Sequence, residues 1–265
     1  MNITTKELQT KLTIMMNDFH QFLVSKDIRY FLYCGSLLGA VRHGGFIPWD
    51  DDMDIGMFRD DFNKLLETAS ELPKPYKLRY RSLSDTDSNF PYTFAKIEDT
   101  STILVEKNIQ HLGIRSGLYI DIFIFDGTPD NKLLRYIHNI KYTFWCGVRN
   151  LVLIDKNKKR DFLKQIPVVI AQKLFTLEKT MNKLMNLAQK YPISECKNVT
   201  VYTRKVNPPF LKINLQQGNL LGFGEYNFYG VKNNDYLLKI EYGDYMKLPP
   251  EGKRVAHHEY ELTIK

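Results

Sequence analysis

Residues 35–58, GSLLGAVRHGGFIPWDDDMDIGMF, place four aspartates between a tryptophan and an isoleucine. With Asp60, which follows shortly after, five aspartates lie within the eleven residues 50–60. Neighbouring carboxylates repel one another, and apolar neighbours strengthen the repulsion because they exclude water. A bound cation would compensate this charge. The alternative is a solvated acidic turn, the usual meaning of a bare run of aspartates, but the flanking Trp49, Ile55 and Met57 argue against it.

The alternation of side chains along a strand predicts how these aspartates are arranged. Residues 53–58, MDIGMF, form an apolar stretch after a turn at Pro48 and are predicted to be a strand. Asp50, Asp52 and Asp54 then project to one face, and the apolar residues between them project into a core. Asp52 and Asp54 can share a hard divalent cation such as Mg²⁺. Asp51 falls on the other face and is predicted to belong to a turn or to support the metal ligands indirectly.

A further carboxylate, Asp121, lies within residues 118–126, LYIDIFIFD, where its neighbours are apolar or aromatic. An ionised carboxylate that is buried without a partner costs several kcal/mol. We therefore expect Asp121 on a strand next to Asp52 and Asp54, where it completes the metal site. The alternative is an aspartate at a sheet edge or at the cap of a loop. Asp126 is a weaker candidate because DGTP is a turn signal.

Residues 34–36, CGS, are predicted to join a strand at 29–34 to a short helix at 37–43, with Ser36 as the N-cap. Backbone N–H groups, a hydroxyl and a helix N-terminus at such a junction attract anions. Arg42 and His43 add cationic donors. Gly35, Ser36, Arg42 and His43 are therefore predicted to hold phosphates opposite the metal site, which indicates phosphoryl chemistry.

The remaining pattern predicts an α+β fold. An apolar periodicity predicts a helix over 5–26, and residues 60–72 predict a second. Strands are expected near 76–82, 92–99, 101–106 and 116–127, and 131–191 is expected to be helical with a break at Pro167. The tail from residue 195 is predicted to be irregular. This suggests a catalytic core over 1–130, a basic helical segment over 131–194 and a substrate-binding C-terminal region over 195–265, packed as one compact unit.

Composition excludes several classes of protein. The 265 residues are 43% hydrophobic and 25% charged, which is ordinary for a globular protein and excludes disordered and fibrous chains. Cys34, Cys146 and Cys196 are too few and too far apart for a disulfide framework or a cysteine zinc site. We find neither a leader peptide nor a membrane-spanning run, so the sequence predicts a cytoplasmic protein.

The net charge of +7 is uneven, because residues 130–190 hold thirteen Lys and Arg against four Asp and Glu. This segment predicts an acidic partner. A solvated helical face, an anionic lipid surface and a phosphate-rich substrate all remain open. Nucleic acid is not expected as a partner because RNA-binding motifs are absent.

Three stretches carry a resemblance to a known family. Residues 35–57, GSLLGAVRHGGFIPWDDDMDIGM, residues 117–127, GLYIDIFIFDG, and residues 242–258, YGDYMKLPPEGKRVAHH, resemble the LicD family of phosphotransferases. That family includes bacterial phosphocholine transferases and, more distantly, fukutin-related protein. The resemblance implies a nucleotidyltransferase fold like that of DNA polymerase beta, with a mixed sheet and flanking helices. No zinc site is carried over, because the cysteine cluster of the fukutin-related relative is absent.

The resemblance also implies an activity. A phospho-alcohol such as phosphocholine would move from a CDP-linked donor to a sugar hydroxyl of a cell-surface glycan (teichoic acid, capsule or lipopolysaccharide), with release of CMP. Mg²⁺ or Mn²⁺ on Asp52, Asp54 and Asp121 would bridge the diphosphate, and Asp121 would lie nearest the attacking hydroxyl. The alternatives are a nucleotidyltransferase that moves NMP to a small acceptor with release of pyrophosphate, and a metal-free scaffold in a membrane assembly.

Several residues have two open interpretations. Lys96 is a candidate phosphate ligand or a strand lysine that reaches solvent. Arg254, His257 and His258 lie in a polar loop and could all be surface groups, but the resemblance makes Arg254 and His257 candidate substrate ligands. Five aromatic residues could enclose a quaternary ammonium or pack in the core: Tyr226, Phe228, Tyr229, Tyr242 and Tyr245. The basic segment, with Lys156, Lys158, Lys159 and Arg160, is expected to touch an anionic membrane, at the inner face of the plasma membrane, or an acidic glycan acceptor.

Overall fold

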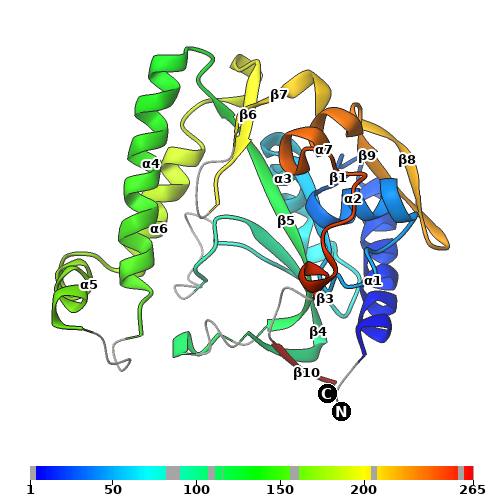
Figure 1. Cartoon of the computed structure of the whole chain (residues 1–265), viewed down its shortest axis with the longest axis horizontal. Helices are drawn as coiled ribbons and strands as arrows, with labels where there is room; N and C mark the ends of the chain where they lie inside the picture. The colour runs from blue at the N-terminus through cyan, green and yellow to red at the C-terminus, as the bar shows by residue number, and fades with distance from the viewer. Residues whose placement is uncertain are drawn as a thin grey trace. The chain divides into compact units, whose positions relative to one another are not determined.

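The computed structural model describes residues 4–81, 90–106, 111–114, 116–155, 161–203, 208–255 and 260–264 (Figure 1). The chain forms two compact units. Residues 1–79, 95–125 and 210–265 make the first, and residues 80–94 and 126–209 make the second. The division into 1–130, 131–194 and 195–265 stays a prediction about functional segments. No helix within the described residues is both long and apolar enough to cross a membrane.

The first helix confirms the prediction from periodicity. α1 spans Thr5–Ser25 and begins with a capping box, in which Thr4 and Glu7 exchange hydrogen bonds through their side chains and backbone N–H groups. The apolar residues that recur at three- and four-residue steps in this helix are all buried: Leu8, Leu12, Met15, Met16, Phe19, Phe22 and Leu23. Their burial fixes one face of α1 against the core of the first unit.

A mixed sheet forms the centre of the first unit. Its strand order is β1-β2-β5-β4-β10, and β3 also pairs with β4. The strands are β1 Phe31–Leu32, β2 Asp54–Phe58, β3 Tyr76–Arg79, β4 Ala95–Glu106, β5 Ser116–Thr128 and β10 Tyr260–Ile264. β2 and β5 are parallel, and the other pairs are antiparallel. The sheet and its helices confirm the α+β class.

Two predicted strands, 92–99 and 101–106, are joined in β4. The register with β5 shifts between Asp99 and Leu104. At the shift, the Asp99 carboxylate accepts a hydrogen bond from the backbone N–H of Ser101 at 2.8 Å, and the Thr102 hydroxyl donates to the Asp99 carbonyl at 2.8 Å. These local bonds make a bulge rather than a break in the strand.

The helices α2 (Cys34–His43), α3 (Arg59–Thr68) and α7 (Asn234–Tyr242) also belong to the first unit. The prediction of an irregular tail is wrong, because β8 (Gln217–Phe223) and β9 (Tyr226–Val231) form a hairpin that turns at Gly224 with φ +62°. The Asn233 side chain then caps α7 by accepting from Tyr236 N at 3.0 Å. β7 is Phe210–Leu211, and a 3-10 turn covers Glu251–Lys253.

The second unit is mainly helical. It contains α4 (Lys132–Val152), α5 (Phe162–Leu174), α6 (Leu177–Ala188) and β6 (Asn198–Val201), which pairs with β5. Its core is formed by Tyr142, Cys146, Met181, Leu184, Ala188 and Tyr202. The predicted break at Pro167 is wrong, since α5 runs through it and ends at Leu174. A proline removes one backbone hydrogen bond and does not always end a helix.

The three cysteines are free thiols, as predicted.

Candidate active site

The pairing of β2 with β5 brings two candidate aspartates together. Asp54 is the first residue of β2, and its Cα partner on β5 is Asp121. The Asp121 N–H donates to the Met53 carbonyl at 2.9 Å, which extends the ladder by one residue. Met53, Ile55 and Met57 are buried as predicted. The predicted placement of Asp121 on a strand next to Asp54 is therefore confirmed.

The junction before the aspartates differs from the prediction. α2 begins at Cys34, and Ser36 is therefore inside the first turn rather than at the N-cap. Cys34 has φ +44°, a region that residues other than glycine rarely adopt. The buried Ser36 hydroxyl accepts a hydrogen bond from Asp54 N at 2.8 Å. Ser36 thus fixes the start of β2, and it does not line the pocket described below.

Gly35 lies in close contact with the Asp50 side chain. A Cβ at this position would come within 2.5 Å of the Oδ2 atom of Asp50. The absence of a side chain allows the aspartate run to pack directly against the start of α2.

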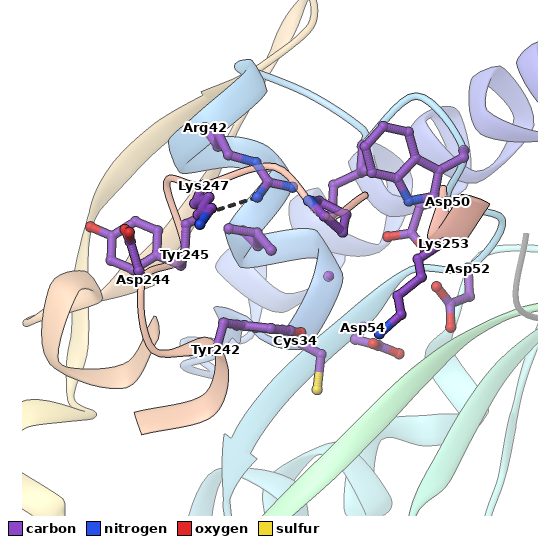
Figure 2. A pocket seen from close by; sticks show the side chains of 15 residues that line it. Cys34, Arg42, Asp50, Asp52, Asp54, Tyr242, Asp244, Tyr245, Lys247 and Lys253 are labelled. Carbon is purple, nitrogen blue, oxygen red and sulfur yellow. Dashed lines mark hydrogen bonds between the residues drawn. The ribbon is translucent and has the colours of Figure 1, made fainter. Parts of the chain in front are cut away.

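A pocket of about 500 Å³ opens between α2, residues 47–54 and residues 242–253 (Figure 2). Its acidic lining comes from Asp50, Asp52, Asp54 and Asp244, and its cationic lining from Arg42, Lys247 and Lys253. Figure 2 shows the Lys253 side chain directed toward Asp54. The pocket therefore presents acidic and basic groups together, as a site for a metal and a phosphate-bearing ligand requires.

Asp54 is the electrostatic centre of this group. Only 7% of it is exposed. Burial raises the pKa of Asp54 well above its usual range, and the carboxylates of Asp52, Asp121, Asp50 and Glu241 raise it further. Burial and then Asp54 likewise raise the pKa of the Cys34 thiol, which stays protonated at neutral pH. A cation placed among these groups would stabilise their ionised forms.

The aspartate run offers a second possible set of metal ligands. Among the described residues, the carboxylates of Asp50, Asp51 and Asp52 have oxygens within 4.8 Å of one another. Asp50 and Asp51 are buried, and Asp52 is half-buried. Asp51 is absent from the pocket lining, as its position in the sequence predicted, yet its carboxylate reaches those of its two neighbours.

One interpretation of the sequence placed the Lys96 side chain in solvent, and this interpretation is wrong. Lys96 is 2% exposed, and its Cα partner on β5 is Asp121. Its Nζ atom lies 3.4 Å from the Oδ1 atom of Asp121 and 3.0 Å from the centre of the Tyr119 ring. Lys96 is thus the buried counter-ion of Asp121, a role that the strand pattern alone could not show.

The other predicted cations have different positions. The Arg42 guanidinium donates to the Tyr245 carbonyl at 2.7 Å and to the His43 ring at 3.0 Å, and it lines the pocket. His43 is exposed and outside the lining. Arg254 donates to the Pro249 carbonyl at 2.9 Å and lies 5.8 Å from the Trp49 ring centre, so it orders the loop that carries Lys253. His257 and His258 lie outside the described residues.

Glu241 is a carboxyl that sequence reasoning missed. It lies in the last turn of α7, one residue before the 242–258 motif, and the Tyr33 hydroxyl donates a hydrogen bond to it. Burial raises the pKa of Glu241 to about 7. An acidic residue at a helix C-terminus opposes the helix dipole. This placement could have been a signal only if α7 had been predicted, and the tail was predicted to be irregular.

The five aromatic residues do not meet in one cage. Phe228 is fully buried in the hairpin and Tyr226 stacks on it, with 6.3 Å between ring centres. Tyr229 packs against Tyr30 with ring centres 5.8 Å apart. Only Tyr242 and Tyr245 line the pocket.

Residues 27–144 match the family model described as LicD/FKTN/FKRP, nucleotidyltransferase domain. These residues are therefore similar to the LicD family. The lipopolysaccharide cholinephosphotransferase LicD of Haemophilus influenzae is 29% identical over 278 residues, which cover 99% of this chain and 98% of that protein. The ribitol 5-phosphate transferase FKRP of Homo sapiens is 54% identical over 39 residues, 15% of this chain and 8% of that protein. The matched residues contain α2, β2 and the Asp121 region of β5, and the pocket wall at 242–253 lies C-terminal to them.

Removing the charge of Glu241 should change how stability depends on pH. The raised pKa means that the folded state favours the protonated carboxyl, so this stabilisation is fully present below the ordinary value of 4.5 and is lost as the pH rises through about 7. Glu241→Gln should therefore match the wild type near pH ~4 and exceed its free energy of unfolding near pH ~8 by up to about 3 kcal/mol. Urea unfolding without added metal measures this.

The exposed Glu225 provides the control, because Glu225→Gln should show no such difference. Equal stability of Glu241→Gln and wild type at both pH values would contradict the burial of this carboxyl.

Proposed function

We propose that the chain is a Mg²⁺-dependent phosphotransferase with a nucleotidyltransferase fold. It transfers phosphocholine or another phospho-alcohol from a CDP-linked donor to a sugar hydroxyl of a cell-surface glycan. One observation carries the proposal: Asp54 and Asp121 are paired on neighbouring strands, and Asp54 lines a pocket together with Asp52. The relative that aligns over nearly the whole chain bears the name of a cholinephosphotransferase, which supports this reaction class.

The residues present fit a divalent cation. Three aspartates and Glu241 surround the Asp54 carboxyl, whose pKa is raised by burial and by their charge, and oxygen ligands of this kind suit Mg²⁺ or Mn²⁺. Asp52, Asp54 and Asp121 would hold the metal in our proposal. When bound, the metal would supply neutralisation of the charge that develops on the transferred phosphoryl group.

The protein groups have separate tasks in this reaction. Asp121 would take the proton of the sugar hydroxyl as its oxygen attacks the phosphorus that carries the alcohol. The bond from that phosphorus to the CMP oxygen breaks, and CMP leaves. Lys96 favours the ionised form of Asp121, which a base requires. Arg42, Lys247 and Lys253 would hold the diphosphate by charge-assisted hydrogen bonds.

We propose only the class of the acceptor. It is a glycan of a teichoic acid, a capsule or a lipopolysaccharide, either free or linked to a lipid. We include peripheral contact with an anionic membrane, because a lipid-linked acceptor would place the enzyme beside one. Transfer of NMP with release of pyrophosphate is the second candidate, and the family model's description as a nucleotidyltransferase domain favours keeping it.

Donor binding tests the pocket. CDP-choline, CDP-ribitol and CDP-glycerol are compared by calorimetry with Mg²⁺, and at least one should bind. Arg42→Ala should weaken its binding about 30-fold, or about 2 kcal/mol, because a charge-assisted phosphate contact is lost.

Arg42 could act by holding the loop at Tyr245 or by contacting the donor phosphate, and Arg254→Ala distinguishes these two roles. Both arginines hold carbonyls of the same loop, but only Arg42 lines the pocket. If Arg254→Ala weakens binding as much as Arg42→Ala, loop order rather than phosphate contact explains the effect. Donor affinity that is unchanged in Arg42→Ala would remove this residue from the site.

A further inference from the structure

The helix α4 is apolar on two faces. One face is buried within the second unit through Tyr142, Cys146 and Val148, and α4 packs there against α6. On the opposite side, large side chains are exposed at helical spacing, and Leu133 and Phe144 are 66% and 61% exposed. The exposed apolar residues of α4 are Leu133, Leu134, Tyr136, Ile137, Ile140 and Phe144. A helix in a globular protein normally has one apolar stripe, and that stripe faces the core.

The helix α5 repeats this pattern next to α4. Val168 and Ala171 are buried, whereas Leu163, Ile166, Val169, Ile170 and Leu174 are exposed. α5 packs beside the C-terminal end of α4 (Figure 1). The Gln172 side chain fixes the two helices together, because its Nε2 atom lies within hydrogen-bonding distance of the carbonyls of Leu151, Val152 and Ile154. More than half of the large apolar side chains that are exposed in the described part of the chain lie on these two helices.

The charge on these helices has one sign. Neither α4 nor α5 contains an aspartate or a glutamate. Their lysines, Lys132, Lys141, Lys164 and Lys173, are all exposed. Lys164 forms an ion pair at 2.9 Å with Asp161, just before α5. An exposed apolar surface bordered by lysines and bearing exposed aromatic rings is typical of helices that lie in the interface of an anionic bilayer.

We propose that the exposed apolar residues of α4 and α5, together with Lys132, Lys141 and Lys173, form a docking face for an anionic phospholipid membrane. The face lies on the membrane surface, with its apolar side chains among the headgroups and its lysines on lipid phosphates. A second copy of the chain is the poorer occupant, since two such faces would bring like charges together. The proposal gives a surface to the membrane contact included in the proposed function. The predicted contacts at 156–160 lie outside the described residues and are not part of it.

Vesicle flotation with the full chain tests this face. Vesicles of phosphatidylcholine with added phosphatidylglycerol should bind the protein, vesicles of phosphatidylcholine alone should bind it far less, and about 0.5 M NaCl should release it. Replacing Lys132, Lys141 and Lys173 by Gln should weaken partition about a hundredfold, at about fivefold per lysine. Phe144→Gln with Leu163→Gln should weaken it at least about tenfold.

Two controls make the result specific. Ile14→Gln changes an exposed apolar residue of α1, which should leave partition unchanged, and circular dichroism shows whether the α4 and α5 variants are folded. Equal binding to both kinds of vesicle, or no binding to either, would overturn the proposal. The proposal would also be overturned if the chain self-associates in sedimentation experiments and the Phe144 and Leu163 changes abolish that self-association but leave lipid binding intact. The assay uses neither donor nor acceptor, so its failure would leave the transferase proposal standing.

Discussion

Asp54→Asn is expected to lower turnover at least about a hundredfold, which corresponds to about 2.7 kcal/mol of lost transition-state stabilisation. Asp52→Asn and Asp121→Asn should have effects of the same size, because the three carboxylates are proposed to hold one metal site. Steady-state rates of CMP release from the CDP-linked donor measure these losses. The Asp54 variant should be no less stable than wild type, since the change removes a buried carboxyl that four other carboxylates disfavour.

Two neighbouring aspartates serve as matched controls. Asp60→Asn changes an exposed aspartate of the same acidic stretch, in the first turn of α3, and should leave turnover unchanged. Asp51→Asn should be much milder than Asp54→Asn. If Asp51→Asn is as damaging, the metal lies in the cluster of Asp50, Asp51 and Asp52, and the proposed ligand set is wrong.

Lys96→Met is expected to lower the free energy of unfolding by about 3 kcal/mol. Lys96 is 2% exposed and lies 3.4 Å from the Asp121 carboxylate, and removing one partner of a buried ion pair leaves the other charge uncompensated. Methionine keeps most of the side-chain volume, so the loss reports charge rather than packing. Urea unfolding at neutral pH measures it.

The double variant distinguishes this pair from a packing effect. Adding Asp121→Asn to Lys96→Met should restore most of the lost stability, because the buried charge is then gone. Lys77→Met, at an exposed lysine of β3, should cost less than about 0.5 kcal/mol. If the losses in free energy of unfolding of the two single variants simply add in the double variant, Lys96 and Asp121 do not stabilise one another.

Local patterns predicted the elements whose signals are local. The spacing of apolar residues in α1 and the apolar run around Asp121 each identify one element without any information from elsewhere in the chain. The neighbouring positions of Asp54 and Asp121 could also be predicted, because a buried carboxylate requires a partner and the aspartate run supplied the obvious one.

Contacts between distant segments could not be predicted in this way. Ser36 is a good N-cap residue by type, but its hydroxyl binds Asp54 N, eighteen positions along the chain. The partners of Lys96 and Glu241 depend on the register of β4 with β5 and on where α7 ends, and neither follows from composition. The hairpin β8–β9 was missed because its glycines and aromatic residues resemble a loop when read without a pairing partner.

The identity of the leaving group tests the central claim most directly. Wild-type protein is incubated with Mg²⁺, a CDP-linked donor that binds and a lipopolysaccharide or teichoic acid acceptor, and the products are followed by phosphorus NMR. The account predicts that CMP appears in step with a new phosphodiester on the glycan, and that neither forms with Asp54→Asn. Release of pyrophosphate from CTP, with NMP joined to an acceptor and no CMP from any CDP-linked donor, would contradict it.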